Sequence, residues 1–150
     1  MAQASRRTEP VAVAEVLGGE RSLGRRIRTP LELEECARAG FPTDVIGALL
    51  EKAVVSPREL YGWIVPRRTL AHRVKKRERL SLEESNRVSR VARIWAQAVE
   101  TFGAADKARR WLRKPIRQFG GRTPMEMLET ELGAHQVEML LGRIAHGLAA

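Results

Sequence analysis

The chain has 150 residues, of which 43% are hydrophobic and 30% charged, so it can form one domain or two small ones around a moderate core. Only 5% are aromatic, and the abundant Leu, Ala, Val, Glu and Arg favour helices over sheets, so the expected fold class is all-α. The single cysteine, Cys36, excludes an internal disulfide. No apolar run approaches the ~18 to 20 residues that span a bilayer, and the first residues lack the apolar region of a signal peptide. We therefore expect a cytoplasmic protein with no membrane partner.

The net charge of +9 and the pI near 10.9 suggest a polyanionic partner. The charge is unevenly distributed along the chain. Residues 56–95 carry eleven Lys and Arg against four Asp and Glu, whereas residues 29–55 carry more acids than bases. A nucleic-acid contact is therefore expected in the middle of the chain.

Residues 1–28 mix small residues and arginines around Gly18-Gly19 and offer only a short apolar stretch. This composition predicts a mostly disordered basic arm. An alternative is that its arginines contact DNA phosphates; these are Arg21, Arg25, Arg26 and Arg28.

Two helices are predicted next, over residues 29–39 and about 43–53. Ser56-Pro57 with Glu59 then has the pattern of a capping box and begins a short helix, which Pro66 must end. Residues 67–77 can form a further helix, with Leu70, Ala71 and Val74 facing inward. A short helix, a tight turn and a basic helix form the layout of a helix-turn-helix.

The basic helix contains the candidate DNA-binding residues. Arginine can read guanine, lysine and arginine can neutralise phosphates, and threonine can approach a phosphate or a thymine methyl group. On this basis the candidates are Arg67, Arg68, Thr69, Arg73 and Lys76. The seven basic residues between Arg67 and Arg79 are equally consistent with a non-specific electrostatic contact.

Ser81, with Glu84 three residues later, is predicted to cap a long helix whose apolar positions continue to Phe102. This helix would connect the helix-turn-helix to the rest of the chain. The domain boundaries that follow are 29–103 for the helix-turn-helix domain with its connecting helix, and 104–150 for a small C-terminal domain.

The C-terminal third is predicted to form three helices. Residues 105–113 form one that ends before Pro115, and Thr123-Pro124 with Glu126 begins a second. Gly133 is expected to close the second helix, and residues 134–146 show the apolar spacing of a third.

This C-terminal pattern resembles the toxin-binding domain of the Xre/MbcA/ParS antitoxins, which are partners of RES-domain toxins. The matching residues are Ala108, Trp111, Leu112, Pro115, Gly120, Gly121, Thr123, Pro124, Leu128, Gly133, Val137, Leu140, Leu141, Gly142, Ile144 and Gly147. Residues 65–87 are likewise similar to the Xre-like helix-turn-helix of the same family.

The resemblance implies a type II antitoxin that covers the active site of an NAD-consuming or ADP-ribosylating RES toxin and represses its own operon. It also implies a homodimer within a larger toxin-antitoxin complex. The residues that it places against the toxin are Met139, Arg143, His146, Gly147, Leu148, Ala149 and Ala150.

The sequence offers no catalytic, metal-binding or cofactor-binding motif. His72, His135 and His146 are scattered, and Gly120-Gly121 lacks the lysine of a phosphate-binding loop. We therefore expect a binding protein that is not an enzyme and has no cofactor. The alternative function is a stand-alone helix-turn-helix transcription regulator whose C-terminal domain only dimerises.

Overall fold

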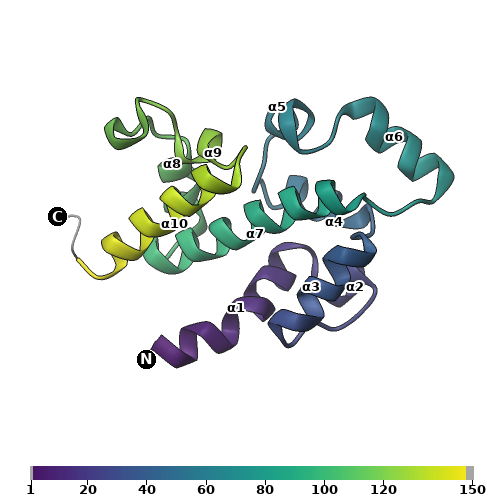
Figure 1. The fold of residues 1–150 in the computed structure, drawn as a ribbon, viewed down its shortest axis with the longest axis horizontal. Helices are drawn as coiled ribbons and strands as arrows, with labels where there is room; N and C mark the ends of the chain where they lie inside the picture. The colour runs from purple at the N-terminus through teal and green to yellow at the C-terminus, as the bar shows by residue number, and fades with distance from the viewer. Residues whose placement is uncertain (1, 148–150) are drawn as a thin grey trace. The chain divides into compact units, whose positions relative to one another are not determined.

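The computed structural model describes the backbone of residues 2–147 and the side chains of residues 9–147. Within this range the chain forms helices and no strands, which confirms the all-α prediction (Figure 1). The chain divides into two compact units, residues 1–92 and residues 93–150, and the boundary falls inside one long helix.

The described part of the first unit contains six α-helices, one π-helical turn and the beginning of the long helix. They are α1 (Ala2–Val16), α2 (Gly19–Leu23), α3 (Pro30–Ala39), α4 (Asp44–Glu51), α5 (Pro57–Glu59), the π-helical turn η1 (Leu60–Ile64), α6 (Arg67–Lys76) and the start of α7 (Leu82–Phe102). The second unit contains the end of α7, α8 (Ala105–Leu112), the 3-10 turn η2 (Arg117–Phe119), α9 (Pro124–Met127) and α10 (Glu131–Ala145).

The predicted disordered arm is wrong for residues 9–28. Four residues of this stretch are buried: Val13 in α1, Leu17 directly after α1, Leu23 at the end of α2, and Ile27 in the segment that follows α2. α1 packs against α2 and α3, and α2 packs against α4. These buried residues are few and a glycine pair interrupts them, so the sequence shows no continuous helical period here.

The predicted helix starts are observed at the expected side chains. Thr29 Oγ1 accepts a hydrogen bond from the Glu32 amide, and Thr123 Oγ1 accepts one from the Glu126 amide, both at 3.1 Å. Ser56 and Glu59 form a complete capping box. These caps satisfy amides that have no partner within the helix, and they fix where each chain segment turns.

Gly133 does not end a helix as predicted, because it lies inside the first turn of α10. Thr130 is the N-cap, and its Oγ1 accepts a hydrogen bond from the Gly133 amide at 2.9 Å. A Cβ at residue 133 would lie 1.9 Å from the Met127 carbonyl oxygen. The glycine is therefore required by the close approach of α9 to α10.

The core of the second unit is formed by buried apolar side chains of α7 to α10. They include Trp95, Ala108, Leu112, Phe119, Met125, Leu128, Val137, Leu140 and Leu141. Trp111 is half-buried, and its ring lies 5.3 Å from that of Phe102. The apolar positions predicted from helical spacing in this unit are thus mostly core positions.

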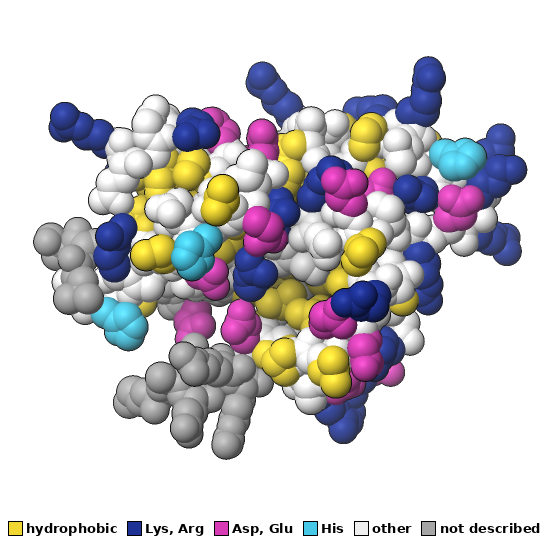
Figure 2. All heavy atoms as spheres, viewed as in Figure 1, with side chains coloured by type: hydrophobic (Ala, Val, Ile, Leu, Met, Phe, Trp, Pro, Cys, Tyr) yellow, Lys and Arg dark blue, Asp and Glu magenta, His cyan; other side chains and the backbone are white. Residues whose placement is uncertain are grey.

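The basic helix α6 differs from the sequence prediction, because none of its residues is buried. Leu70 is half-buried, Ala71 is exposed and Val74 is 57% exposed. Lysine and arginine side chains gather around this helix (Figure 2). Apolar burial therefore contributes little to the position of α6, and other contacts must hold it.

We expect Leu17→Ala to lower the free energy of unfolding by about 2–5 kcal/mol, because it leaves a cavity in a packed site. The matched control is Val11→Ala in α1, where the side chain is 41% exposed and the loss should be under about 1 kcal/mol. Urea unfolding followed by circular dichroism measures both. Equally small losses for the two variants would show that the end of α1 does not pack against the rest of the first unit.

We expect Gly133→Ala to destabilise the second unit by about 1–3 kcal/mol, because the added methyl group meets a backbone oxygen. Gly142, on the same helix, has open space around the Cβ position. Gly142→Ala should therefore stabilise the unit by about 0.5–1 kcal/mol through helix propensity. Thermal unfolding of the two variants should shift in opposite directions, and a shift in the same direction would contradict the close approach.

Candidate functional site

The helix-turn-helix consists of α5 with η1, a turn at Val65-Pro66, and α6. Ser56 Oγ accepts a hydrogen bond from the Glu59 amide, and Glu59 Oε1 accepts one from the Ser56 amide at 2.8 Å. At the other end of this helix, the Val65 amide donates to the Leu60 carbonyl at 3.0 Å. Pro66 then gives the extended geometry from which α6 begins.

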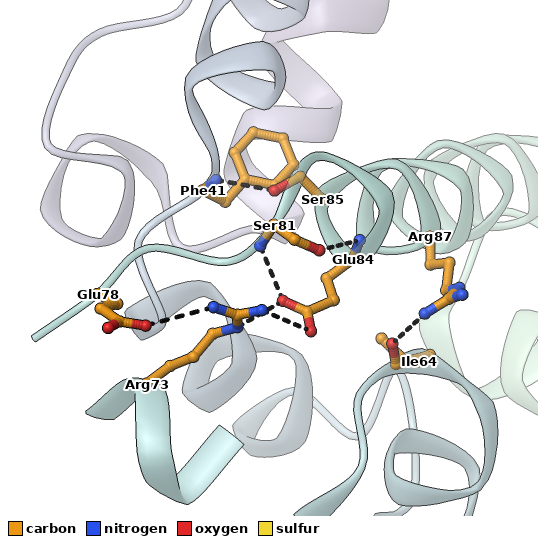
Figure 3. Close-up of polar contacts among 8 residues, drawn as sticks. All are labelled: Phe41, Ile64, Arg73, Glu78, Ser81, Glu84, Ser85 and Arg87. Carbon is orange, nitrogen blue, oxygen red and sulfur yellow. Dashed lines mark hydrogen bonds and ion pairs between the residues drawn. The ribbon is translucent and has the colours of Figure 1, made fainter. Parts of the chain in front are cut away.

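An ion pair between Arg73 and Glu84 joins α6 to the first turn of α7 (Figure 3). Arg73 Nε lies 2.7 Å from Glu84 Oε1, and Arg73 Nη1 lies 3.5 Å from Glu78 Oε2. Glu84 Oε1 also accepts a hydrogen bond from the Ser81 amide, and Ser81 Oγ accepts one from the Glu84 amide. The same carboxylate therefore caps α7 and holds α6; we call Arg73, Ser81 and Glu84 the α6–α7 bridge.

Glu84 is buried, and burial alone raises the pKa of its carboxyl group. Hydrogen bonds from Ser81 and the charge and hydrogen bond of Arg73 outweigh this effect, so that the pKa is lowered from its ordinary value. The carboxylate is therefore ionised at neutral pH, and the ion pair is intact there.

Two further residues of α7 fix the surrounding segments of the first unit (Figure 3). Arg87 Nη1 donates to the Ile64 carbonyl at 3.2 Å, at the end of η1. Ser85 Oγ accepts a hydrogen bond from the Phe41 amide at 2.9 Å. The first two turns of α7 thus hold both helices of the helix-turn-helix and the loop after α3.

The loop after α3 lies directly against the segment that leads into α7. The Leu80 amide donates to the Phe41 carbonyl at 2.9 Å, and Arg79 Nη1 donates to the Gly40 carbonyl at 3.1 Å. A Cβ at Gly40, where φ is +92°, would lie 2.2 Å from the Leu80 carbonyl oxygen. Only glycine satisfies both the left-handed backbone and this close approach.

The structure divides the five predicted DNA-binding residues into two groups. Arg67 lies over the Tyr61 ring at 4.4 Å, and Arg73 belongs to the α6–α7 bridge, so both have intramolecular contacts. Arg68 and Lys76 are exposed and Thr69 is half-buried. His72, which we did not predict, is exposed and shares their side of α6, as the spacing 68, 72, 76 indicates.

The described members of the predicted partner-binding set lie from the middle of α10 to the residues directly after it. Met139 is 48% exposed, Arg143 Nη2 donates to Gln118 Oε1 at 3.3 Å, and His146 and Gly147 end the helix. Leu148, Ala149 and Ala150 lie outside the described residues. No catalytic arrangement is suggested by this set.

Sequence reasoning missed Leu132, which is 82% exposed at the beginning of α10. Leu132, Gln136, Met139 and Arg143 are all exposed and spaced i, i+4, i+7 and i+11, so they lie on one side of the helix. We call these four residues the α10 face. Leu132 and Gln136 also line an open depression of about 400 Å³ with Arg122, Glu126 and Thr130. The spacing of Leu132 with the predicted Met139 and Arg143 was the available signal in the sequence.

The described residues hold no group of three or more His, Cys, Asp or Glu side chains placed to bind a metal ion. Among the same residues, no helix combines the length and apolarity needed to cross a bilayer.

Two family models match the chain. Residues 32–93 match the antitoxin Xre-like helix-turn-helix domain, and residues 97–147 match the antitoxin Xre/MbcA/ParS C-terminal toxin-binding domain. A protein named antitoxin Xre from Pseudomonas putida is 39% identical over 150 residues, covering 93% of this chain and 94% of that protein. The chain belongs to the Xre antitoxin family.

Two other antitoxins named Xre are similar to this antitoxin. The protein from Yersinia enterocolitica is 37% identical over 134 residues, covering 85% of this chain and 90% of its own. The protein from Photorhabdus laumondii is 40% identical over 84 residues, covering 55% of this chain and 57% of its own. The antitoxin thus has a helix-turn-helix domain followed by a toxin-binding domain, as the resemblance implied, and the α10 face lies in the latter.

Protonation of Glu84 should loosen the first unit of the antitoxin. Because its folded pKa is lowered, its stabilising contribution is present above the unfolded pKa of about 4.3 and is lost as pH falls through the folded pKa. We expect Glu84→Gln to cost about 1–3 kcal/mol at pH 7 and progressively less below about pH 4.

Urea unfolding at several pH values, followed by circular dichroism, measures this difference. Glu83→Gln is the control, because Glu83 is 80% exposed and only pairs with Arg87 on the helix surface. A pH-independent difference between wild type and Glu84→Gln would contradict the ion pair.

Proposed function

We propose that this antitoxin neutralises a RES-domain toxin by covering the active site of the toxin with the α10 face and the chain end. The observation that carries the proposal is the exposure of Leu132 and Met139 in the domain that matches a toxin-binding family. Large apolar side chains on a folded surface are typical of the centre of a protein interface.

The chemistry of the α10 face suits a protein partner. Leu132 and Met139 can enter apolar pockets, and methionine adapts its shape to irregular surfaces. Gln136 and Arg143 can supply hydrogen bonds around them. Inhibition then needs only binding, because occlusion of the toxin keeps NAD or the ADP-ribose acceptor away from its catalytic residues.

We further propose that the antitoxin represses its own operon through α6. Arg68, Thr69, His72 and Lys76 would face the major groove, while Arg67 and Arg73 position the helix through Tyr61 and Glu84. In a homodimer, two α6 helices would read half-sites about one DNA turn, roughly 34–36 Å, apart.

The two activities should separate by mutation. We expect Leu132→Asp with Met139→Asp to weaken toxin binding at least tenfold, about 1.4 kcal/mol, because it places charges in an apolar contact. DNA binding should be retained. Arg68→Ala with Lys76→Ala is the matched control and should weaken DNA binding while leaving toxin neutralisation intact.

The measurements are NAD consumption by the RES protein of the same operon with each antitoxin variant, and DNA affinity of the antitoxin alone. Full neutralisation by the Leu132/Met139 variant would contradict the proposed surface. Purification of the tagged antitoxin from its host with DNA but no protein partner would support a stand-alone transcription regulator instead.

A further inference from the structure

Two basic segments that are distant in the sequence both contact α3 or the residue that follows it. Arg25, which follows α2, lies 3.6 Å from Glu32 and 3.9 Å from Glu35 of α3. Arg79, which follows α6, donates to the Gly40 carbonyl directly after α3. Burial raises the pKa of the Cys36 thiol in α3, and the charges of Arg25 and Arg79 both oppose that rise. Both guanidinium groups therefore lie near Cys36.

The segment after α2 is held in place by its own buried residues. Leu23 and Ile27 are buried, and Gly24 ends α2 with a φ of +74°. Arg26 and Arg28 stand on either side of Ile27 in the sequence, and both are exposed. An ordered segment thus presents two arginines to solvent.

Three nearby acidic residues of this unit have basic partners: Glu32 and Glu35 lie beside Arg25, and Glu78 lies beside Arg73. Among the described residues, neither Arg26 nor Arg28 forms an ion pair with a carboxylate. On the other segment, Lys75, Lys76 and Arg77 are exposed at the end of α6. Figure 2 shows lysine and arginine side chains along the right edge of the view, from α6 down past the region of α2 and α3.

We propose that Arg26 and Arg28 form a second DNA-binding surface, which contacts the phosphate backbone of the duplex that α6 binds. This proposal rests on the proposed DNA binding by α6. The two arginines lie outside residues 32–93, which match the helix-turn-helix family. Arginine binds phosphate oxygens bidentately, and an ordered segment loses less conformational entropy on binding than a disordered arm. Arg25 has a different role, because it neutralises the acids of α3.

Phosphate contacts contribute affinity and salt dependence without sequence preference. A contact by Arg26 and Arg28 can therefore be measured from the salt dependence of DNA affinity. The probe is a mixed-sequence DNA duplex of about 30 base pairs, roughly three helical turns. We expect Arg26→Ala with Arg28→Ala to reduce the slope of log affinity against log salt by up to about 2, since each phosphate contact contributes about 0.9. Arg26→Lys with Arg28→Lys should retain most of the slope.

The matched control is Lys107→Ala with Arg110→Ala, which removes the same charge from exposed positions of α8 in the second unit. A slope for Arg26→Ala with Arg28→Ala equal to that of the control would overturn the second surface while leaving DNA binding by α6 intact. No salt-dependent binding by the wild-type antitoxin would overturn both. Circular dichroism of each variant confirms that the exposed substitutions leave the fold unchanged.

Discussion

The carboxylate of Glu84 is the group on which the arrangement of the first unit depends. It caps α7 through Ser81 and holds α6 through Arg73, so one side chain sets both the start of one helix and the position of another. The dependence is strong because α6 buries no side chain of its own. In most small helical domains, an amphipathic helix is held by its apolar face, whose contribution is insensitive to pH and salt. Here a charged contact performs that task.

Close backbone approach is the second constraint, and it occurs once in each unit. Gly40 lets the loop after α3 lie against Leu80, and Gly133 lets α10 start against the Met127 carbonyl. In both places the glycine is required by a neighbour and not by flexibility. These contacts fix the loop after α3 against the segment that follows α6, and they fix the beginning of α10.

The sequence predicted much of this fold because its helix starts are marked by side chains that act locally. Thr29, Ser56, Ser81 and Thr123 each satisfy an amide three residues ahead, and such a contact is visible in the sequence. The residue pattern of the C-terminal third resembled the Xre/MbcA/ParS toxin-binding domain, and the family model that matches residues 97–147 is that domain. Contacts between distant residues were not predictable in this way. The partnership of Arg73 with Glu84, the packing of Leu17 and Leu23, and the close approach at Gly133 all depend on tertiary placement.

The candidate sites also divide into local features that the sequence predicted and tertiary contacts that it did not. The sequence predicted that the basic residues of α6 point to solvent, and Arg68 and Lys76 are exposed. It could not show that Arg67 and Arg73 have intramolecular partners. Leu132 was not predicted, because it precedes the apolar stripe of residues 134–146 that defined the last helix in the sequence. The exposed fraction of a side chain depends on the folded chain, and only the structure shows that Leu132 is exposed while Val137 is buried.

The absence of fully buried side chains on α6 has an evolutionary consequence. Substitutions at its exposed positions, such as Arg68, His72 and Lys76, are expected to change the packing of the unit little. These positions are therefore open to rapid divergence at little cost in stability. Duplicated copies of such a gene can acquire different surface chemistry on this helix while they retain the same scaffold.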